Sequence, residues 1–324
     1  MSRVDLHIHS TYSADGQYSP GELIQMARRE NLEILSLTDH NSSRGCREMA
    51  GLAAQAGMKF ISGIELDCRF QGTWLHVLGY GIDPDFPGFL QLEEDIIRQE
   101  RANADGKIKA FENMGFGIDR AQLSRLSYKG IVWGEMIGEV ILADERNARH
   151  QALEPYRPGG ARSDNPMVNF DWDFCSPGQA AHFRVEFIEL DEALSLIRQA
   201  GGRPVLAHPG RDVKENPDLL KAIAERGLWG LEAFSSYHTP SQTAFYRYWG
   251  TKLGLVLTCG SDLHGKTKPA IRLGSVACGP VENYETGPPV LAGEESVSPF
   301  RQLIQAINSL IALTCVSEEG EAAI

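Results

Sequence analysis

The chain has 324 residues, of which 42% are hydrophobic and 23% charged, a composition typical of soluble globular proteins with one large or two modest domains. The formal net charge of −12 argues against a general polyanion-binding protein. Residues 1–20 lack a basic start followed by an apolar run, and no uninterrupted apolar window of about 18 residues occurs. We therefore expect neither secretion nor membrane spanning. The six cysteines lie far apart without a C-x-x-C pair, which favours free thiols in a reducing cytoplasm.

The N-terminal part alternates short apolar strands with helices. Ser19-Pro20-Gly21-Glu22 has the form of a capping box with proline at the first helical position, which predicts that a helix begins there. Gln71-Gly72 lies between two apolar runs and predicts a hairpin. The expected strands are 4–9, 33–40, 60–67 and 74–80, and a second helix is expected over 44–56.

Residues 84–189 interrupt this alternation. The pattern predicts one long helix over 89–114 and helical pieces within 121–142, whereas residues 155–178 are rich in Pro, Gly, Asn and Asp and show little periodicity. One interpretation is that this segment is a solvent-exposed surface insertion. We favour the other, an inserted cap that supplies cationic groups to a ligand, because long insertions are more often functional than idle.

The alternation resumes after residue 190. A helix is expected over 190–200, and Asn216-Pro217 and Thr239-Pro240 carry the start signals of two more. Strands are expected at 205–208, 230–234 and 255–258, followed by a loop over 282–299 and an amphipathic helix around 300–311. Repeated strand–helix units indicate a parallel sheet that helices close or cover, and the pattern alone leaves open whether it forms a barrel.

Many of the strands end in side chains that bind metals. His7 and His9 are two residues apart, so both imidazoles lie on one face of the first strand, and Asp15 follows in a loop that can fold back toward them. Further segments of this kind end at His40, Glu65, His76, His208, Asp262 and His264. Several imidazoles and carboxylates together suit zinc, manganese or iron, and more than one ion with a bridging carboxylate. The alternative for each residue alone is a loop or satisfied core position.

The motifs that carry these residues resemble a known family. They are His7-x-His9, Thr38-Asp39-His40, Gly63-Ile64-Glu65, His76, Ala207-His208-Pro209 and Gly260-Ser261-Asp262-x-His264. In this order they resemble the PHP (polymerase and histidinol phosphatase) phosphoesterases. The Asp15 loop, the Glu232-x-Phe-x-x-x-His238 segment and the insertion are similar to the branch that includes the 3′,5′-nucleotide bisphosphate phosphatases. The resemblance implies a distorted (β/α)7 barrel formed by residues 1–83 and 190–324, with a mainly helical cap at 84–189.

The resemblance also implies a ligand set for two or three divalent ions. His7, His9, Glu65 and Asp262 would hold the first ion, Glu65 would bridge to a second at His76 and His208, and Asp15, His40 and His264 would hold a third. Some relatives have a histidine where this chain has Asp15. An oxygen ligand there favours manganese or iron over zinc. Asp39 is interpreted as a carboxylate that orients a ligand imidazole.

The activity that the resemblance implies is removal of the 3′-phosphate from nucleoside 3′,5′-bisphosphates, such as adenosine 3′,5′-bisphosphate, by a metal-activated water. Asp262 and His238 are the predicted catalytic residues, with His238 protonating the leaving alkoxide unless it is only a surface histidine. Candidates for binding the substrate are His238 and four cationic residues that could equally be solvated charges, namely Lys129, Arg184, Arg211 and Lys266.

Three other functions stay open at this point. The protein could be a 5′-3′ exoribonuclease on short 5′-phosphorylated RNA, a histidinol-phosphate phosphatase, or a non-catalytic metal-binding module. The expected partner is a small nucleotide and possibly short RNA, with no membrane and no obligate protein partner. The expected location is the cytoplasm.

Overall fold

The computed structural model describes residues 4–276 and Gln305. Seven strands follow one another in one sheet in the order β1-β2-β3-β4-β6-β7-β8, and β5 pairs with β3 beside this path. The strands are β1 (Val4–Ile8), β2 (Ile34–Leu37), β3 (Lys59–Phe70), β4 (Thr73–Tyr80), β5 (Ile188–Glu189), β6 (Arg203–Leu206), β7 (Gly230–Ser235) and β8 (Val256–Gly260). Neighbouring strands are parallel except for β4, which is antiparallel to β3 and to β6.

The sheet nearly closes into a barrel. Just beyond β8, the Asp262 amide donates to the His7 carbonyl at 2.8 Å, and the His9 amide donates to the Leu263 carbonyl at 3.0 Å. These bonds join the first strand to the segment after the last one. Leu6, Ile61, Tyr80 and Val205, from four different strands, share one buried apolar cluster, as expected for side chains that fill a barrel. The predicted distorted (β/α)7 barrel is confirmed.

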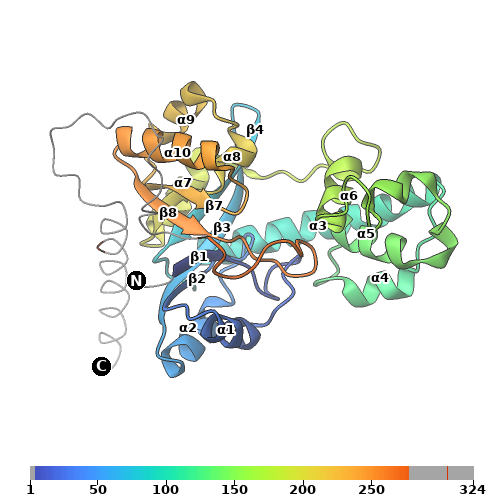
Figure 1. Cartoon of the computed structure of the whole chain (residues 1–324), viewed down its shortest axis with the longest axis horizontal. Helices are drawn as coiled ribbons and strands as arrows, with labels where there is room; N and C mark the ends of the chain where they lie inside the picture. The colour runs from blue at the N-terminus through green and yellow to red at the C-terminus, as the bar shows by residue number, and fades with distance from the viewer. Residues whose placement is uncertain (1–3, 277–304, 306–324) are drawn as a thin grey trace.

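Helices surround the barrel and make up much of the insertion (Figure 1). Around the barrel are α1 (Pro20–Arg29), α2 (Cys46–Gln55), α7 (Leu190–Gln199), α8 (Pro209–Asp212), α9 (Pro217–Ala224) and α10 (Pro240–Lys252). The insertion contains α3 (Pro87–Asn113), α4 (Arg120–Leu126), α5 (Gly134–Ala143), α6 (Pro166–Cys175) and two 3-10 turns at Glu145–Asn147 and Gln151–Tyr156. The predicted capping boxes are present at Ser19 and Thr239.

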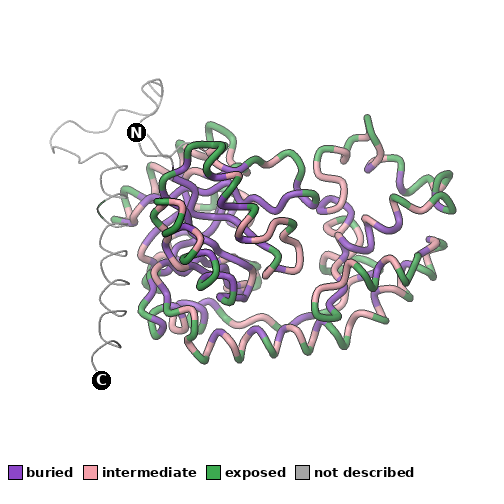
Figure 2. Tube along the Cα trace, turned by 90° about the horizontal axis from the view of Figure 1, so that it is seen from below, coloured by how far each residue is buried: buried purple, intermediate pink, exposed green. Residues whose placement is uncertain are grey.

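The insertion has an apolar core of its own. Helix α3 leaves the barrel and leads to α4, α5 and α6, and Figure 2 shows buried positions in both parts of the molecule. Phe89, near the start of α3, packs in the barrel core, whereas Phe111, near its end, packs with Ile137 and Phe170 of the insertion. The insertion is therefore helical. The domain limits at residues 83/84 and 189/190 stay a prediction.

Some expectations differ from the structure. Residues 155–178, which show little periodicity, contain α6, because Pro166 begins the helix and Phe170 and Phe174 stack against other aromatic side chains. Cys46, Cys68 and Cys175 are free thiols as expected, but Cys259 forms a disulfide. Sequence spacing does not report which cysteines the fold brings together. The elements expected over 282–299 and around 300–311 lie outside the described residues, apart from the helical Gln305. Within the described part of the chain, no helix has the length and apolarity needed to cross a membrane.

Candidate metal centre

The mouth of the barrel gathers all nine candidate metal ligands. Because parallel strands end at one edge of the sheet, residues that follow β1, β2, β6 and β8 meet there, and the hairpin of β3 and β4 adds two more. They form four overlapping groups whose ligand atoms lie within 4.8 Å of one another inside each group. The groups are His7-His9-Glu65-Asp262, Glu65-His76-His208, His9-Asp15-His40-His264 and His40-Asp67-His76.

Glu65 is the residue that joins these groups. Its side chain is fully buried, and its two oxygens face different imidazoles. Oε2 lies 3.2 Å from Nε2 of both His7 and His9, whereas Oε1 lies 2.8 Å from Nδ1 of His76 and 3.2 Å from Nε2 of His208. A carboxylate in this position can bridge two ions.

The first group has the form of a cation site. Nε2 of His7, Nε2 of His9, Oε2 of Glu65 and Oδ1 of Asp262 are all buried, and none has a hydrogen-bond partner among the described residues. Asp262 Oδ1 lies 3.1 Å from His7 Nε2 and 3.0 Å from His9 Nε2. Buried acceptors that face one another are costly unless a cation or a proton lies between them. The donor set of two imidazoles and two carboxylates therefore fits a divalent ion.

The pKa values of these groups show strong mutual attraction. Burial raises the pKa of Glu65, but the imidazoles of His40, His7 and His76 outweigh burial and hold that pKa well below its usual value. Burial alone lowers the pKa of His7, yet the carboxylates of Glu65, Glu232 and Asp262 raise it well above normal. Without metal, protons on imidazoles balance the carboxylates. Ion binding would displace these protons.

Glu232 holds two of the histidines in place. It is fully buried, with Oε1 3.1 Å from His7 Nδ1, and Oε2 accepts a 2.7 Å hydrogen bond from the His208 amide. The His7–Glu232 contact leaves Nε2 of His7 turned toward the first group. Carboxylates that orient metal-binding imidazoles in this way raise ligand basicity. In the sequence, Glu232 is only part of the segment that carries the family resemblance, and no role was predicted for it.

Asp67 is a member of the cluster that the sequence analysis missed. It lies two residues after Glu65 on β3, so it projects from the same face of the strand, and that alternation could have identified it. Oδ1 lies 3.4 Å from His40 Nδ1 and 3.2 Å from His76 Nε2. Oδ2 accepts a hydrogen bond from Asn41 at 2.6 Å. Asp67 therefore contacts imidazoles that belong to two different groups.

The third predicted group contains an additional cation. Asp15 Oδ2 lies 2.9 Å from His264 Nε2 and 3.8 Å from His40 Nε2. The ammonium of Lys268, which the sequence analysis did not single out, lies 2.8 Å from Asp262 Oδ2 and 3.3 Å from His264 Nε2. Tyr237 donates a hydrogen bond to the same Asp262 oxygen at 2.7 Å.

Asp39 does not orient an imidazole through its hydrogen bonds, contrary to the interpretation above. Its two oxygens accept from the amide and the hydroxyl of Ser10 at 2.6 and 2.8 Å. Asp39 therefore fixes the turn that directly follows His9. Because the hydroxyl and the amide of Ser10 both donate to it, the Asp39 carboxylate faces the loop after β1.

The cluster opens into a cavity of about 250 Å³ between the barrel mouth and the insertion. Asp15, His40, Asp67 and His76 form its floor, and helices α3, α5 and α6 contribute to its walls. The remaining lining includes the aromatic residues Trp74, Trp133 and Trp172, the cations Lys107, Arg211 and Lys268, and the carboxylates Glu100, Glu135 and Asp171. The Arg211 guanidinium lies 5.6 Å from the Trp172 ring centre. Of the five predicted substrate-binding residues, the structure brings Arg211 to this cavity.

His238 is held away from the cluster. Its Nδ1 donates to the Ala233 carbonyl at 3.0 Å, and its Nε2 accepts from the Gly210 amide at 3.0 Å. The ring also stacks on Tyr246, and burial lowers its pKa. Both ring nitrogens are thus occupied by the backbone. This arrangement does not support the predicted transfer of a proton to a leaving group.

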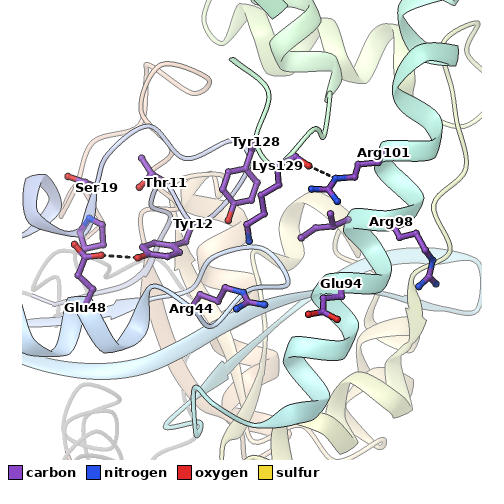
Figure 3. A pocket seen from close by; sticks show the side chains of 12 residues that line it. Thr11, Tyr12, Ser19, Arg44, Glu48, Glu94, Arg98, Arg101, Tyr128 and Lys129 are labelled. Atoms are coloured by element: carbon purple, nitrogen blue, oxygen red, sulfur yellow. Dashed lines mark hydrogen bonds between the residues drawn. The ribbon is translucent and has the colours of Figure 1, made fainter. Parts of the chain in front are cut away.

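The other three predicted phosphate contacts lie elsewhere. Lys129 lines a separate crevice of about 840 Å³ (Figure 3). Its ammonium lies 2.9 Å from Oε1 of Glu93. Lys266 pairs with Glu139 at 2.7 Å, and Arg184 pairs with Glu186. Each is an exposed or half-exposed cation that already has a carboxylate partner. The sequence gives the position of each cation in the chain but does not indicate which carboxylate its side chain faces.

Fold and site together define a class of protein, an α/β barrel with a cluster of His, Asp and Glu side chains at its mouth that could hold metal ions. The PHP domain family matches residues 5–127. A solved amidohydrolase from Chromobacterium violaceum with bound sulfate is 26% identical, has a TM-score of 0.68 and covers 85% of this chain and 91% of its own. Residues 5–127 are therefore similar to the PHP domain, and the chain as a whole is similar in fold to this amidohydrolase.

Relatives with assigned activities are similar over most of the chain. A 3′,5′-nucleoside bisphosphate phosphatase from Chromobacterium violaceum is 28% identical over 82% of this chain and 88% of its own. A phosphoribosyl 1,2-cyclic phosphate 1,2-diphosphodiesterase from Eggerthella lenta is 26% identical over 81% and 94%. A 5′-3′ exoribonuclease from Haemophilus influenzae is 26% identical over 81% and 90%. Their reactions share a phosphate ester and differ in its organic part.

Proposed function

We propose that this protein is a metal-dependent phosphomonoesterase that removes the 3′-phosphate from nucleoside 3′,5′-bisphosphates. The observation that carries the proposal is the ring of four buried acceptor atoms of His7, His9, Glu65 and Asp262, which have no hydrogen-bond partner among the described residues. The ring lies next to His40, which lines the floor of the cavity. Such a ring is suited to an ion and is costly otherwise. A relative with this activity covers most of the chain.

The chain's own residues would set the geometry of the centre. His7, His9, Glu65 and Asp262 would hold one ion, and Glu65, His76 and His208 a second. Such ions clamp phosphate oxygens, lower the pKa of a bound water and offset charge on the leaving oxygen. Tyr237 and Lys268 bind Asp262 Oδ2, which leaves Oδ1 directed at the imidazoles.

The cavity supports a nucleotide as the organic part of the substrate. A nucleoside 3′,5′-bisphosphate presents a flat base and a second phosphate in addition to the reacting one. Trp133 and Trp172 supply aromatic surface, and Arg211 supplies a guanidinium beside it. Flat bases stack on aromatic rings, and Arg suits phosphate recognition because of its planar fork of donors. The metal identity, with manganese favoured, is part of the proposal.

The test is turnover of a panel of esters in the presence of manganese, with chromatography measuring inorganic phosphate, the ring-opened monoester and released mononucleotides separately. The panel contains adenosine 3′,5′-bisphosphate, 3′-AMP, 5′-AMP, histidinol phosphate, a ribose 1,2-cyclic phosphate and a short 5′-phosphorylated RNA. We expect kcat/KM to be highest for the bisphosphate by at least about 100-fold, since losing the second phosphate removes charge-assisted contacts. His9→Ala and Asp262→Ala should abolish turnover, and His150→Ala, a histidine of the insertion, should not.

A preference for the RNA would identify an exoribonuclease instead. Equal activity of wild type and the two metal-ligand variants would contradict catalysis at this centre. Bound metal without turnover of any ester would favour the non-catalytic module.

A further inference from the structure

Lys268 is placed at the metal centre by a tight turn of the chain. Its amide donates to the Gly265 carbonyl at 3.0 Å, and the neighbouring Thr267 hydroxyl donates to the Asp15 carbonyl at 3.2 Å. The residue is only 7% exposed. A lysine that deep is normally paired, and Lys268 reaches Asp262 Oδ2 at 2.8 Å while its ammonium lies 5.4 Å from the Tyr237 ring centre.

The hydrogen bonds of His264 define what its second nitrogen can do. Nδ1 lies 2.9 Å from the carbonyl oxygen of Asp262, so Nδ1 carries the proton and donates it. Nε2 is then an acceptor with a single lone pair. It faces the ammonium of Lys268 at 3.3 Å and the carboxylate of Asp15 at 2.9 Å. Two acceptors this close require a cation beside them, and Lys268 brings one.

The first and third groups differ in whether a side chain of the protein supplies a cation to their ligand atoms. The four ligand atoms of His7, His9, Glu65 and Asp262 that face one another are buried and lack hydrogen-bond partners. In the third group, by contrast, Nε2 of His264 already has the ammonium of Lys268 as a partner. His264 Nε2 is therefore served by a side chain of the protein itself, whereas Nδ1 of His40 has no hydrogen-bond partner among the described residues.

We propose that the ammonium of Lys268 takes the place of a third divalent ion beside Asp15, His40 and His264, so that the protein binds two divalent ions per chain. One lone pair on His264 Nε2 cannot serve an ammonium and a metal ion together, and two cations sharing these ligands would repel each other. Asp15 is then a partner of a charged cluster and not a metal ligand. The inference deepens the proposed function and rests on its metal centre.

The ammonium also faces the cavity into which the cluster opens. A phosphate ester held there would meet a fixed positive charge on the Asp15 side without any ion at that position. A site with two ions and the Lys268 ammonium therefore differs from a trinuclear site in the number of bound ions more than in the total positive charge of the site.

The test is a count of bound metal. Purified protein is stripped with a chelator, loaded with excess manganese, passed through a desalting column and analysed for metal and protein. We expect two ions per chain for wild type and three for Lys268→Ala, in which the small side chain frees the lone pair of His264 and the carboxylate of Asp15. Lys266→Ala is the matched control, because Lys266 pairs with Glu139 outside the cluster, and its count should equal that of wild type.

Three manganese ions per wild-type chain would overturn the proposal, as would two in a folded Lys268→Ala protein. The double variant Lys268→Ala/His264→Ala should again bind two manganese ions per chain. Three ions per chain in this variant would also contradict the proposal. Circular dichroism verifies folding, and Lys268→Ser serves if Lys268→Ala does not fold. The wild-type count needs no variant and can overturn the proposal alone. Because no substrate is involved, a count of two stands even if the ester panel shows no turnover, whereas fewer than two ions would contradict both proposals.

Discussion

At the scale of single residues, the centre depends on carboxylates that orient imidazoles. Glu232 turns His7, and Asp67 contacts both His40 and His76. Oδ1 of Asp67 lies 3.4 Å from Nδ1 of His40 and 3.2 Å from Nε2 of His76. One carboxylate therefore lies beside two imidazoles that belong to different groups.

Replacing Asp67 with alanine should weaken manganese binding by about 10- to 100-fold, because both imidazoles lose their orientation. Isothermal titration of the metal-free protein measures the change. Asp95→Ala is the control, since Asp95 contacts the exposed Arg98 and Gln99 of α3, away from the cluster. Unchanged affinity in Asp67→Ala would show that the imidazoles are oriented by other contacts.

The stability of the metal-free protein should fall as the pH rises from 6.5 to 9. Burial lowers the pKa of His208 and His40, but the carboxylates around them outweigh burial and raise these pKa values to about 8 and about 10. A raised pKa stabilises the fold fully below the unfolded value near 6.5 and loses that effect as the pH passes the folded value.

The measurement for this prediction is the melting temperature in chelator between pH 6 and 9. The stabilisation caused by added manganese should increase over the same range, because fewer protons must be displaced. A melting temperature in chelator that rises steadily with pH would contradict the expected sign.

At the scale of elements, α3 connects two separately packed regions. Its first turns lie on the barrel through Phe89, and its last turn lies in the insertion through Phe111, which stacks on Phe170 of α6 with ring centres 5.2 Å apart. The walls of the cavity therefore depend on packing inside the insertion, while the metal ligands depend on the barrel.

Phe170→Ala should destabilise the insertion by about 3 to 5 kcal/mol, the usual cost of removing a buried aromatic ring. The metal count should be retained, and KM for the preferred ester should rise, because the cavity wall loosens while the barrel mouth stays intact. Calorimetry, metal analysis and steady-state kinetics test this together. Tyr248→Ala, at a position 51% exposed, is the control and should change little. Loss of bound metal in Phe170→Ala would show that the two regions fold as one unit.

At the scale of the whole molecule, the metal centre closes the barrel. Asp262 and His7 come from opposite ends of the described chain and meet where the sheet closes. An ion at this position would join β1 to the segment after β8 and would bind only the folded state. Metal binding should therefore stabilise the whole barrel.

Manganese at 100 times its dissociation constant should stabilise the fold by about 2.7 kcal/mol per site relative to protein in chelator. For a chain of this size the melting temperature should rise by roughly 5 °C or more. Thermal unfolding with manganese and with chelator measures the difference. In the double variant His9→Ala/Asp262→Ala the difference should largely disappear, and a full shift in that variant would place the stabilising ions elsewhere.

The sequence by itself determined the parts that depend on neighbours along the chain. The two-residue spacing of His7 and His9 fixes a shared face, and Ser19-Pro20 and Thr239-Pro240 fix helix starts. Strand–helix alternation indicates a parallel sheet covered by helices, and the family resemblance implied that this sheet forms a barrel. These signals act within a few residues.

Only the tertiary structure decided which atoms face one another. It gives Glu65 two separate sets of imidazoles, places Lys268 between Asp262 and His264, and occupies both nitrogens of His238 with backbone groups. It also directs Lys129 to Glu93 in a crevice apart from the metal centre. The physical reason is that these contacts join segments far apart in the chain. Their geometry is set by barrel closure and by packing of the insertion, which no local sequence pattern encodes.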